Sequence, residues 1–312
     1  MKKNETTNSN AEQLDLEAPR GLAKSRSGDS SDREPTKKKK MARVRKRGAE
    51  TEVLTADALL PKVKAIRKRI EAGELGGIPT DFSDLDDACG GIDGLFILGG
   101  KPGVGKSALA IQIGTDAAER SDALCFIHSA EMSATQVVGR ILQRYEAERG
   151  ATPESAERRF EKMAKRLIII DDPHLSPDDI NQRFLTPLRH QTGLKRVLCV
   201  FDSVHVLAKY QAGTSPKTKD AIDRFLTSLR RLASTGDTHV IALAHQPKTE
   251  SAGFYYSESN QFDYLADVTA VLDTSGKSGR VVRIHKNRSG PLVPEIRLRF
   301  VGHALSFSEA SR

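Results

Sequence analysis

The stretch Gly100-Lys101-Pro102-Gly103-Val104-Gly105-Lys106-Ser107 fits the pattern G-x-x-x-x-G-K-[ST], which cradles phosphate groups. It follows the apolar run Leu95-Phe96-Ile97-Leu98 and precedes a helical pattern over Ala108-Leu109-Ala110-Ile111-Gln112-Ile113. This strand, loop and helix context separates a true phosphate-binding loop (P-loop) from a chance match. A glycine-rich turn that only joins a strand to a helix is the alternative, but such a turn needs neither the lysine nor the serine.

The residue types of the P-loop predict how it holds phosphates. Its glycines let successive backbone N–H groups turn toward the phosphates, and the start of the following helix adds partial positive charge. Lys106 would reach the β- and γ-phosphate oxygens, and Ser107 would ligate Mg²⁺. The predicted nucleotide-binding residues are Gly100, Gly103, Val104, Gly105, Lys106, Ser107 and Ala108.

Most of the basic charge lies in the first 48 residues. The chain has 312 residues and a formal net charge of +8, and residues 1–48 hold 14 Lys or Arg against 7 Asp or Glu. Because this segment has almost no large apolar residues, we expect a disordered basic tail. Residues 37–47, of which eight of eleven are basic, either lie on nucleic acid phosphates or form a solvated tail, and Met41 is an alternative start of translation.

A short amphipathic helix is expected in residues 49–75. Apolar residues recur there at helical spacing opposite a basic face, and glycines from Gly73 onward stop the pattern. The apolar positions are Leu59, Val63, Ile66 and Ile70, and the basic ones are Lys62, Lys64, Arg67, Lys68 and Arg69. Two interpretations stay open: the helix docks on a neighbouring subunit, or it packs against its own domain.

The rest of the chain, residues 76–312, predicts one α/β domain that opens with Thr80 as the N-cap of a helix carrying Leu85. Short apolar runs alternate with helical patterns, as is typical of buried parallel strands. These runs are residues 124–128, 167–170, 197–201 and 240–243. The later runs at 268–272, 281–285 and 296–300 are joined by turns. They predict antiparallel strands at the C-terminal edge of a mostly parallel sheet flanked by helices.

The cysteines and the hydropathy pattern predict a compartment. Cys89, Cys125 and Cys199 are far apart and form no C-x-x-C motif, so they read as small buried hydrophobes in a reducing environment, without zinc or disulfides. No stretch approaches 18 consecutive apolar residues, and the N-terminus has no apolar signal core. We expect a cytoplasmic protein with no membrane partner.

Carboxylates that end predicted strands are candidates for contact with the metal and the attacking water. Asp202 ends the run at 197–201, where a carboxylate would face Mg²⁺, and is the first choice. Asp171 and Asp172 end an earlier run in the same way and are the second choice, because a proline follows them directly. Glu131, placed on the strand beside the P-loop strand, would polarise the attacking water.

From about Ile78 to Phe307 the chain resembles the C-terminal motor domain of the bacterial replicative helicases of the DnaB type, within the RecA-like superfamily that includes RadA and KaiC. Four segments besides the P-loop carry the first part of the resemblance: Ser129-Ala130-Glu131-Met132-Ser133, Val200-Phe201-Asp202, the helix pattern from Phe225 to Ala233, and Val240 to Gln246. The resemblance implies that Glu131 is the catalytic carboxylate, that Asp202 and Ser107 hold Mg²⁺, and that His245, with Gln246 next to it, senses the γ-phosphate.

The segment Ile284-His285-Lys286-Asn287-Arg288-Ser289-Gly290-Pro291 resembles that family's K-N-R-x-G-P motif, whose Lys and Arg reach the ATP of the adjacent subunit. Lys286 and Arg288 are two residues apart on a predicted strand, so both side chains project to the same side and could meet one anion. An exposed, charged strand face is the alternative. Catalysis in trans implies a homo-oligomer, which we expect to be a hexameric ring.

The resemblance places two DNA-contacting loops at residues 209–219 and 248–261. Their basic and aromatic side chains would meet phosphates and stack on bases, respectively. These side chains are Lys209, Lys217, Lys219, Lys248, Phe254, Tyr255 and Tyr256. The second loop departs from the family at Ser257-Glu258-Ser259-Asn260, and the family's helical N-terminal domain is replaced by the basic tail, so primase coupling is not carried over.

The combined prediction is a RecA-like ATP hydrolase of the DnaB helicase type, which uses ATP and Mg²⁺ to move along single-stranded DNA in replication, with other replication proteins as further partners. The alternative is a non-translocating regulatory or recombination ATPase resembling KaiC or RadA. A small-molecule P-loop kinase is a weaker third class, because it needs a lid and an acceptor pocket that the sequence does not indicate, and it has no use for Lys286 and Arg288.

Overall fold

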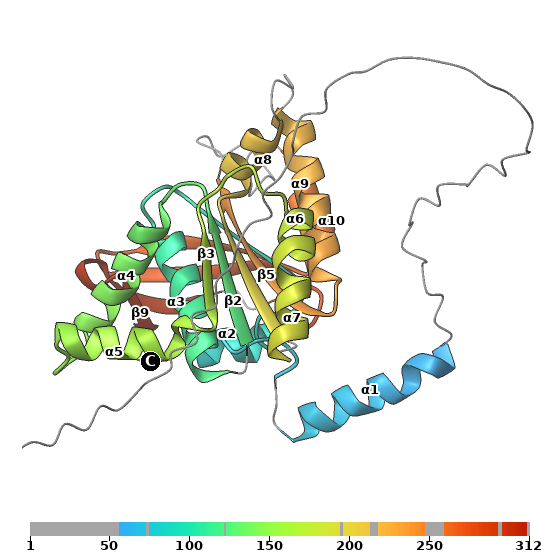
Figure 1. The fold of residues 1–312 in the computed structure, drawn as a ribbon, viewed down its shortest axis with the longest axis horizontal. Helices are drawn as coiled ribbons and strands as arrows, with labels where there is room; N and C mark the ends of the chain where they lie inside the picture. The colour runs from blue at the N-terminus through green and yellow to red at the C-terminus, as the bar shows by residue number, and fades with distance from the viewer. Residues whose placement is uncertain are drawn as a thin grey trace, which may run out of the picture. The chain divides into compact units, whose positions relative to one another are not determined.

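A nine-stranded sheet forms the centre of the fold in the computed structural model (Figure 1). The described residues are 56–72, 75–121, 123–193, 196–212, 218–246, 259–292 and 295–310. The strand order is β3-β2-β4-β5-β1-β6-β7-β8-β9. The strands are β1 Leu95–Gly100, β2 Ala123–Ser129, β3 Leu167–Ile170, β4 Arg196–Asp202, β5 Asp237–His245, β6 Val268–Ser275, β7 Gly279–Asn287, β8 Ile296–Val301 and β9 Ser306–Glu309.

The sheet is parallel from β3 to β6 and antiparallel from β6 to β9. This confirms the predicted fold class, and every apolar run expected to be a strand is one. The short β9 was not predicted, because it offers only four residues with a single buried apolar side chain, Phe307. The prediction that Glu131 follows the strand beside the P-loop strand is wrong: β4 and β5 lie between β2 and β1.

Helices cover both faces of the sheet, with α3, α4 and α5 on one side and α6, α7 and α9 on the other (Figure 1). The helices are α1 Ala56–Glu71, α2 Ser83–Cys89, α3 Lys106–Arg120, α4 Ala134–Glu146, α5 Pro153–Ala164, α6 Pro177–Ile180, the π-helix η1 Asn181–Leu185, α7 Thr186–Thr192, α8 Val204–Ala212, α9 Thr218–Ala233, α10 Gln261–Leu265 and the 3₁₀-helix η2 Gly302–Ala304. None of these described helices is long and apolar enough to cross a membrane.

Two apolar cores result, one on each face of the sheet. Along β1 the side chains alternate between them: Phe96 and Leu98 pack with α3, while Leu95 and Ile97 pack with α9. All six residues of β1 are buried, which explains why this strand reads as a continuous apolar run. Cys89, Cys125 and Cys199 are buried and free.

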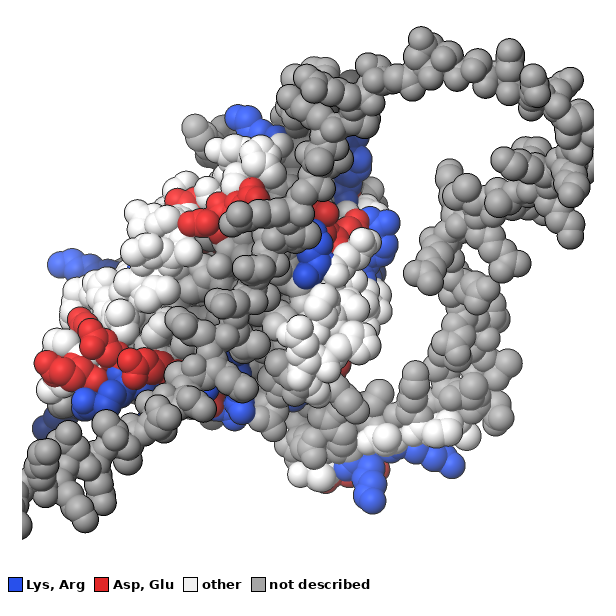
Figure 2. All heavy atoms as spheres, in the orientation of Figure 1, with Lys and Arg blue, Asp and Glu red and all other residues white. Residues whose placement is uncertain are grey.

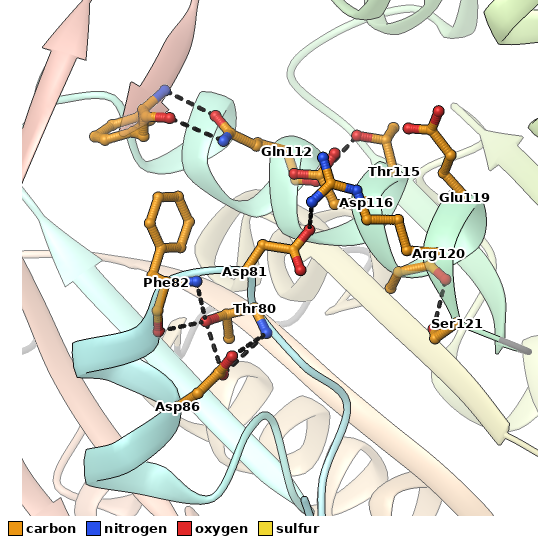
Figure 3. A network of polar contacts seen from close by, with 12 residues as sticks. Thr80, Asp81, Phe82, Asp86, Gln112, Thr115, Asp116, Glu119, Arg120 and Ser121 are labelled. Atoms are coloured by element: carbon orange, nitrogen blue, oxygen red, sulfur yellow. Dashed lines mark hydrogen bonds and ion pairs between the residues drawn. The ribbon is translucent and has the colours of Figure 1, made fainter. Parts of the chain in front are cut away.

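The segment before α2 is fixed by polar contacts rather than by a helix cap (Figure 3). The N-cap of α2 is Phe82, and the predicted cap Thr80 is wrong. Instead, the Thr80 hydroxyl donates to Asp86 Oδ1 at 2.8 Å and accepts a hydrogen bond from Phe82 N–H at 3.2 Å. Asp81 pairs with Arg120 at the end of α3 at 2.7 Å, which ties this segment to the helix that begins in the P-loop.

The segment expected to hold a helix, residues 49–75, contains α1, in which Leu60 and Val63 are exposed. The basic tail lies outside the described residues. Over the coloured part of Figure 2, basic and acidic side chains are interspersed among uncharged ones. This matches the sequence, in which residues 1–48 account for nearly all of the net charge.

Candidate nucleotide-binding site

The carboxyl ends of four neighbouring strands bring the predicted residues together. Gly100 of β1 pairs with His245 of β5, and Ser129 of β2 pairs with Asp202 of β4. All four residues therefore lie at the edge of the sheet that is formed by the carboxyl ends of its parallel strands. The amide of Ala130 donates to the Asp202 carbonyl at 2.8 Å, which carries the chain from β2 toward β4. In an open parallel sheet, this edge is where ligands bind.

The P-loop occupies this edge between β1 and α3. Gly103 and Gly105 have φ values of 77° and 109°, which L side chains rarely adopt, so glycine is needed at both positions. Lys106 is buried, and its ammonium donates to the carbonyls of Gly100 at 2.8 Å and Lys101 at 3.1 Å. Burial lowers its pKa, while the nearby Asp202 and Glu131 carboxylates act in the opposite direction.

Asp202 lies at the end of β4, where its side chain meets that of Ser107. It is 4% exposed, and burial raises the pKa of its carboxyl to about 6, although a hydrogen bond from Ser107 and the charge of Lys106 oppose that rise. Its Oδ2 atom is buried and has no hydrogen-bond partner among the described residues. A buried carboxylate oxygen without a partner next to a serine hydroxyl fits a hard cation such as Mg²⁺.

Glu131 reaches the same edge from the segment after β2. Its Oε1 accepts a hydrogen bond from the Ser203 hydroxyl at 2.6 Å and lies 3.3 Å from His245 Nε2. The hydrogen bond to His245 is the main reason that the pKa of Glu131 falls to about 2, with Ser203 and the charge of Lys106 adding to it. The carboxylate is therefore ionised at neutral pH and can accept a hydrogen bond from water.

His245 is held by a second histidine. The rings of His245 and His205 stack with centroids 4.9 Å apart, and His205 Nδ1 accepts a hydrogen bond from the His245 backbone N–H at 3.3 Å. On its other side, His205 stacks on Phe262 of α10 at 5.5 Å. The position of His245 thus depends on α8 and α10 as well as on β5.

Lys286 and Arg288 contact the segment of their own chain that precedes β6. Lys286 pairs with Thr269, which pairs with Ile97, the third of the six residues of β1, whereas the P-loop follows the carboxyl end of that strand. The Lys286 ammonium donates to the carbonyls of Asp263 and Ala266, and Arg288 binds the Tyr264 carbonyl at 2.9 Å and Asp267 Oδ1 at 3.1 Å. Both side chains therefore point toward the same segment.

The second-choice carboxylates have other partners. Asp171 Oδ2 accepts a hydrogen bond from the Ala134 N–H at the start of α4, and Asp172 Oδ1 accepts one from the His174 N–H. Both follow β3, the outermost strand, with β2 between it and β4. This arrangement favours Asp202 as the residue that faces the P-loop.

The described part of the first predicted DNA-contacting segment is helical, since it belongs to α8 and α9. Lys209 is exposed in α8, which continues to Ala212, and Lys219 is exposed in the first turn of α9. The remaining proposed contacts lie outside the described residues: Lys217, Lys248, Phe254, Tyr255 and Tyr256.

Sequence reasoning missed Ser203, His205 and Arg280. A hydroxyl directly after Asp202 is a local signal that could have drawn attention to Ser203. Arg280 Nε donates to the carbonyl of Val104 in the P-loop at 2.8 Å, across 176 positions of the chain, and no local pattern indicates such a contact.

Comparison with known proteins gives consistent matches. The model of the DnaB-like helicase C-terminal domain family matches residues 77–309. The replicative DNA helicase DnaB of Geobacillus stearothermophilus is 27% identical over 269 residues, which cover 77% of this chain and 58% of that protein. The DNA repair protein RadA of Helicobacter pylori strain 26695 is 24% identical, covering 71% of this chain and 44% of RadA.

The fold also matches the solved structure of a DnaB-like replicative helicase. The TM-score is 0.68 at 20% sequence identity, and the match covers 83% of this chain and 69% of that chain. The DnaB relative from Geobacillus stearothermophilus is matched over little more than half of its length, so the comparison with it concerns one part of a longer protein.

Proposed function

Because this chain belongs to the family of DnaB-like helicase C-terminal domains, we propose that it is an ATP-driven motor that moves along single-stranded DNA during replication. The observation that carries the proposal is the convergence of Lys106, Asp202 and Glu131 at one edge of the sheet, each in a different electrostatic state. A phosphate-binding cation, a buried metal-facing carboxylate and an ionised carboxylate are the parts that nucleotide hydrolysis needs.

We assign the roles as follows. The P-loop amides and Lys106 bind the phosphates of ATP, and Ser107 and Asp202 would hold Mg²⁺. Bound Mg²⁺ would neutralise developing charge on the phosphates. Glu131 orients the attacking water and takes up its proton, since its hydrogen bonds from Ser203 and His245 keep it ionised. His245 pairs with Gly100 of the P-loop strand and contacts Glu131, which supports a role for its ring in sensing the γ-phosphate.

We propose that Lys286 and Arg288 complete the site of a second copy of the chain. Both side chains bind backbone or carboxylate oxygens of residues 263–267, which precede β6, and this supports a role away from their own P-loop. A neighbouring subunit in a ring, which we propose to be hexameric, would present its P-loop to them. The cations would then stabilise charge on the transferring phosphoryl group in trans.

A second candidate, a recombination or regulatory ATPase, is favoured by the similarity to RadA. Two measurements on the full chain separate the candidates: ATP hydrolysis with and without single-stranded DNA, and unwinding of a forked duplex, with particle size measured under the same conditions. Stimulation by DNA together with ATP-dependent unwinding supports the motor. Hydrolysis without strand separation, in an assembled and DNA-bound protein, supports the second candidate.

A further inference from the structure

Arg280 is a buried cation that contacts the P-loop from β7, in the antiparallel part of the sheet. It lies near the start of β7 and is 8% exposed. Its Nε donates to the Val104 carbonyl at 2.8 Å, and its Nη1 donates to the Gly279 carbonyl at 2.8 Å. A buried guanidinium is costly unless its donors are satisfied, so these contacts fix its position firmly.

An aromatic pair from the last two strands supports this guanidinium. It lies over the ring of Phe300 on β8, 5.0 Å from the centroid, and Phe300 packs on Phe307 of β9 at 4.6 Å. A Cβ atom on Gly105 would lie 2.9 Å from Phe307 Cζ, so the P-loop backbone rests directly on this ring. The antiparallel strands therefore form the support on which the P-loop lies.

This support is attached to the helix that follows the P-loop (Figure 3). Gln112 of α3 accepts a hydrogen bond from the Phe307 backbone N–H at 2.7 Å and donates to the Phe307 carbonyl at 3.0 Å. The Phe307 backbone is thus held by α3 while its ring contacts Gly105. Movement of β9 relative to α3 would break both hydrogen bonds.

The Val104 carbonyl controls the direction of a neighbouring amide. Val104 lies between Gly103 and Gly105, which have φ values of 77° and 109°. Because glycine has no Cβ atom, the backbone on either side of Val104 can also adopt other conformations. A trans peptide unit is planar, and its C=O and N–H point in opposite directions. When Arg280 holds the Val104 oxygen on one side, it directs the Gly105 N–H to the other side, where a P-loop amide meets phosphate.

We propose that Arg280 is a positioning residue for nucleotide binding, which holds the P-loop of its own subunit in the phosphate-binding conformation through the Val104 carbonyl. The inference rests on the proposed use of the P-loop for ATP. It requires no contact between Arg280 and the nucleotide.

The first test measures the Kd of a fluorescent ATP analogue together with kcat and KM for ATP. Loss of a charge-assisted hydrogen bond predicts that Arg280→Gln raises Kd and KM about tenfold with a much smaller change in kcat. Arg280→Lys should recover part of the affinity, because an ammonium can donate one hydrogen bond to Val104. Arg283→Gln on the same strand is the matched control and should bind like wild type, since Arg283 pairs with Asp273 and Glu295.

A folded Arg280→Gln protein with wild-type Kd and KM overturns the inference. If that variant does not fold, Phe300→Leu replaces it: loss of the ring under the guanidinium should raise Kd about threefold, and an unchanged Kd again overturns the inference. Lys106→Ala separates this result from the proposed function. Wild-type nucleotide binding by Lys106→Ala contradicts the P-loop assignment itself. If Lys106→Ala loses nucleotide binding while Arg280→Gln binds like wild type, only the role of Arg280 is contradicted.

Mixed assemblies, assayed at an ATP concentration below the raised KM of Arg280→Gln, test whether Arg280 acts within its own subunit. Arg280→Gln subunits keep an intact Arg288, and Arg288→Ala subunits keep an intact P-loop. Mixing the two should therefore restore part of the hydrolysis, at interfaces where these intact parts meet. Mixing with Lys106→Ala subunits should restore nothing, because both lesions affect the P-loop side. Restoration by Lys106→Ala would mean that Arg280 acts on the neighbouring nucleotide and would overturn the inference.

Discussion

Glu131 Oε1 lies 3.3 Å from His245 Nε2, although Glu131 follows β2 and His245 ends β5, two strands that are not neighbours. Ser203 directly follows β4, the strand between these two, and its hydroxyl donates to Glu131 at 2.6 Å and lies 3.4 Å from the same histidine nitrogen. The candidate catalytic carboxylate, the candidate phosphate sensor and the residue after the candidate metal ligand thus form one contact network.

Glu131→Gln should retain nucleotide binding and lose turnover, by about a hundredfold or more, because a neutral amide cannot accept the proton of the attacking water. Lys106→Ala should lose binding itself, since its ammonium is lost from the P-loop. Nucleotide affinity and steady-state hydrolysis, measured on both variants, check the difference. Hydrolysis at the wild-type rate by Glu131→Gln would falsify its assignment.

Asp202→Asn should lose Mg²⁺-dependent turnover, because the amide presents one oxygen without charge to the cation. Asp172→Asn is the matched control and should keep most of its activity, since Asp172 caps a turn next to His174. Hydrolysis measured across a range of Mg²⁺ concentrations compares the two. The opposite pattern would move the metal site to Asp172.

The raised pKa of Asp202 makes a stability prediction. Its pKa rises from 3.8 to about 6 on folding, so the folded protein binds this proton more tightly than the unfolded chain. Ionising the buried carboxyl therefore opposes folding, beginning above pH 3.8 and reaching its full effect above about pH 6. At pH 8, without nucleotide or metal, Asp202→Asn should therefore melt at a higher temperature than wild type. Its free energy of unfolding should exceed that of wild type by at most about 3 kcal/mol.

Thermal melts at pH 8 and pH 5 check this prediction. The advantage of Asp202→Asn should shrink toward pH 5, because wild-type Asp202 is then largely protonated. An equal advantage at both values would mean that the amide stabilises the site for a reason other than charge.

Removal of residues 1–48 should leave basal ATP hydrolysis intact but weaken DNA binding and flatten its salt dependence, because fewer phosphate counterions are released. Removal of residues 1–36 is the matched control: that segment has six basic and seven acidic residues, and the basic run at 37–47 stays in place. The measurement is the slope of log affinity against log salt concentration. Identical slopes for all three proteins would reject a role of the tail on DNA.

Arg288→Ala should fold, assemble and bind ATP, yet hydrolyse it about 10³-fold more slowly, because Arg288 is proposed to act on the next subunit's nucleotide. Mixing Arg288→Ala with Lys106→Ala subunits should restore part of the activity, since some interfaces then combine an intact P-loop with an intact Arg288. Arg297→Ala, which removes another exposed arginine, serves as the control. A mixture that assembles and stays inactive would exclude catalysis in trans.

The local features of this fold could be predicted from the sequence because each lies in one short segment. The P-loop directly follows β1 and opens α3, so its strand, loop and helix are consecutive in the sequence. The runs at 124–128 and 197–201 read as strands because their side chains are buried on both faces of the sheet. The choice of Asp202 likewise depended only on its place at the end of such a run.

Strand order and the contacts between distant segments depended on tertiary structure. Nothing in the run after Leu124 indicates that β2 pairs with β4 instead of β1, because burial makes apolar strands alike at the level of sequence. Thr80 has the residue type of a helix cap, yet its hydroxyl binds Asp86, since the cap position itself falls on Phe82. Arg280 reads as one more charge on a strand until the sheet places it beside Val104, because hydrogen bonds form between atoms that meet in space, whatever their separation along the chain.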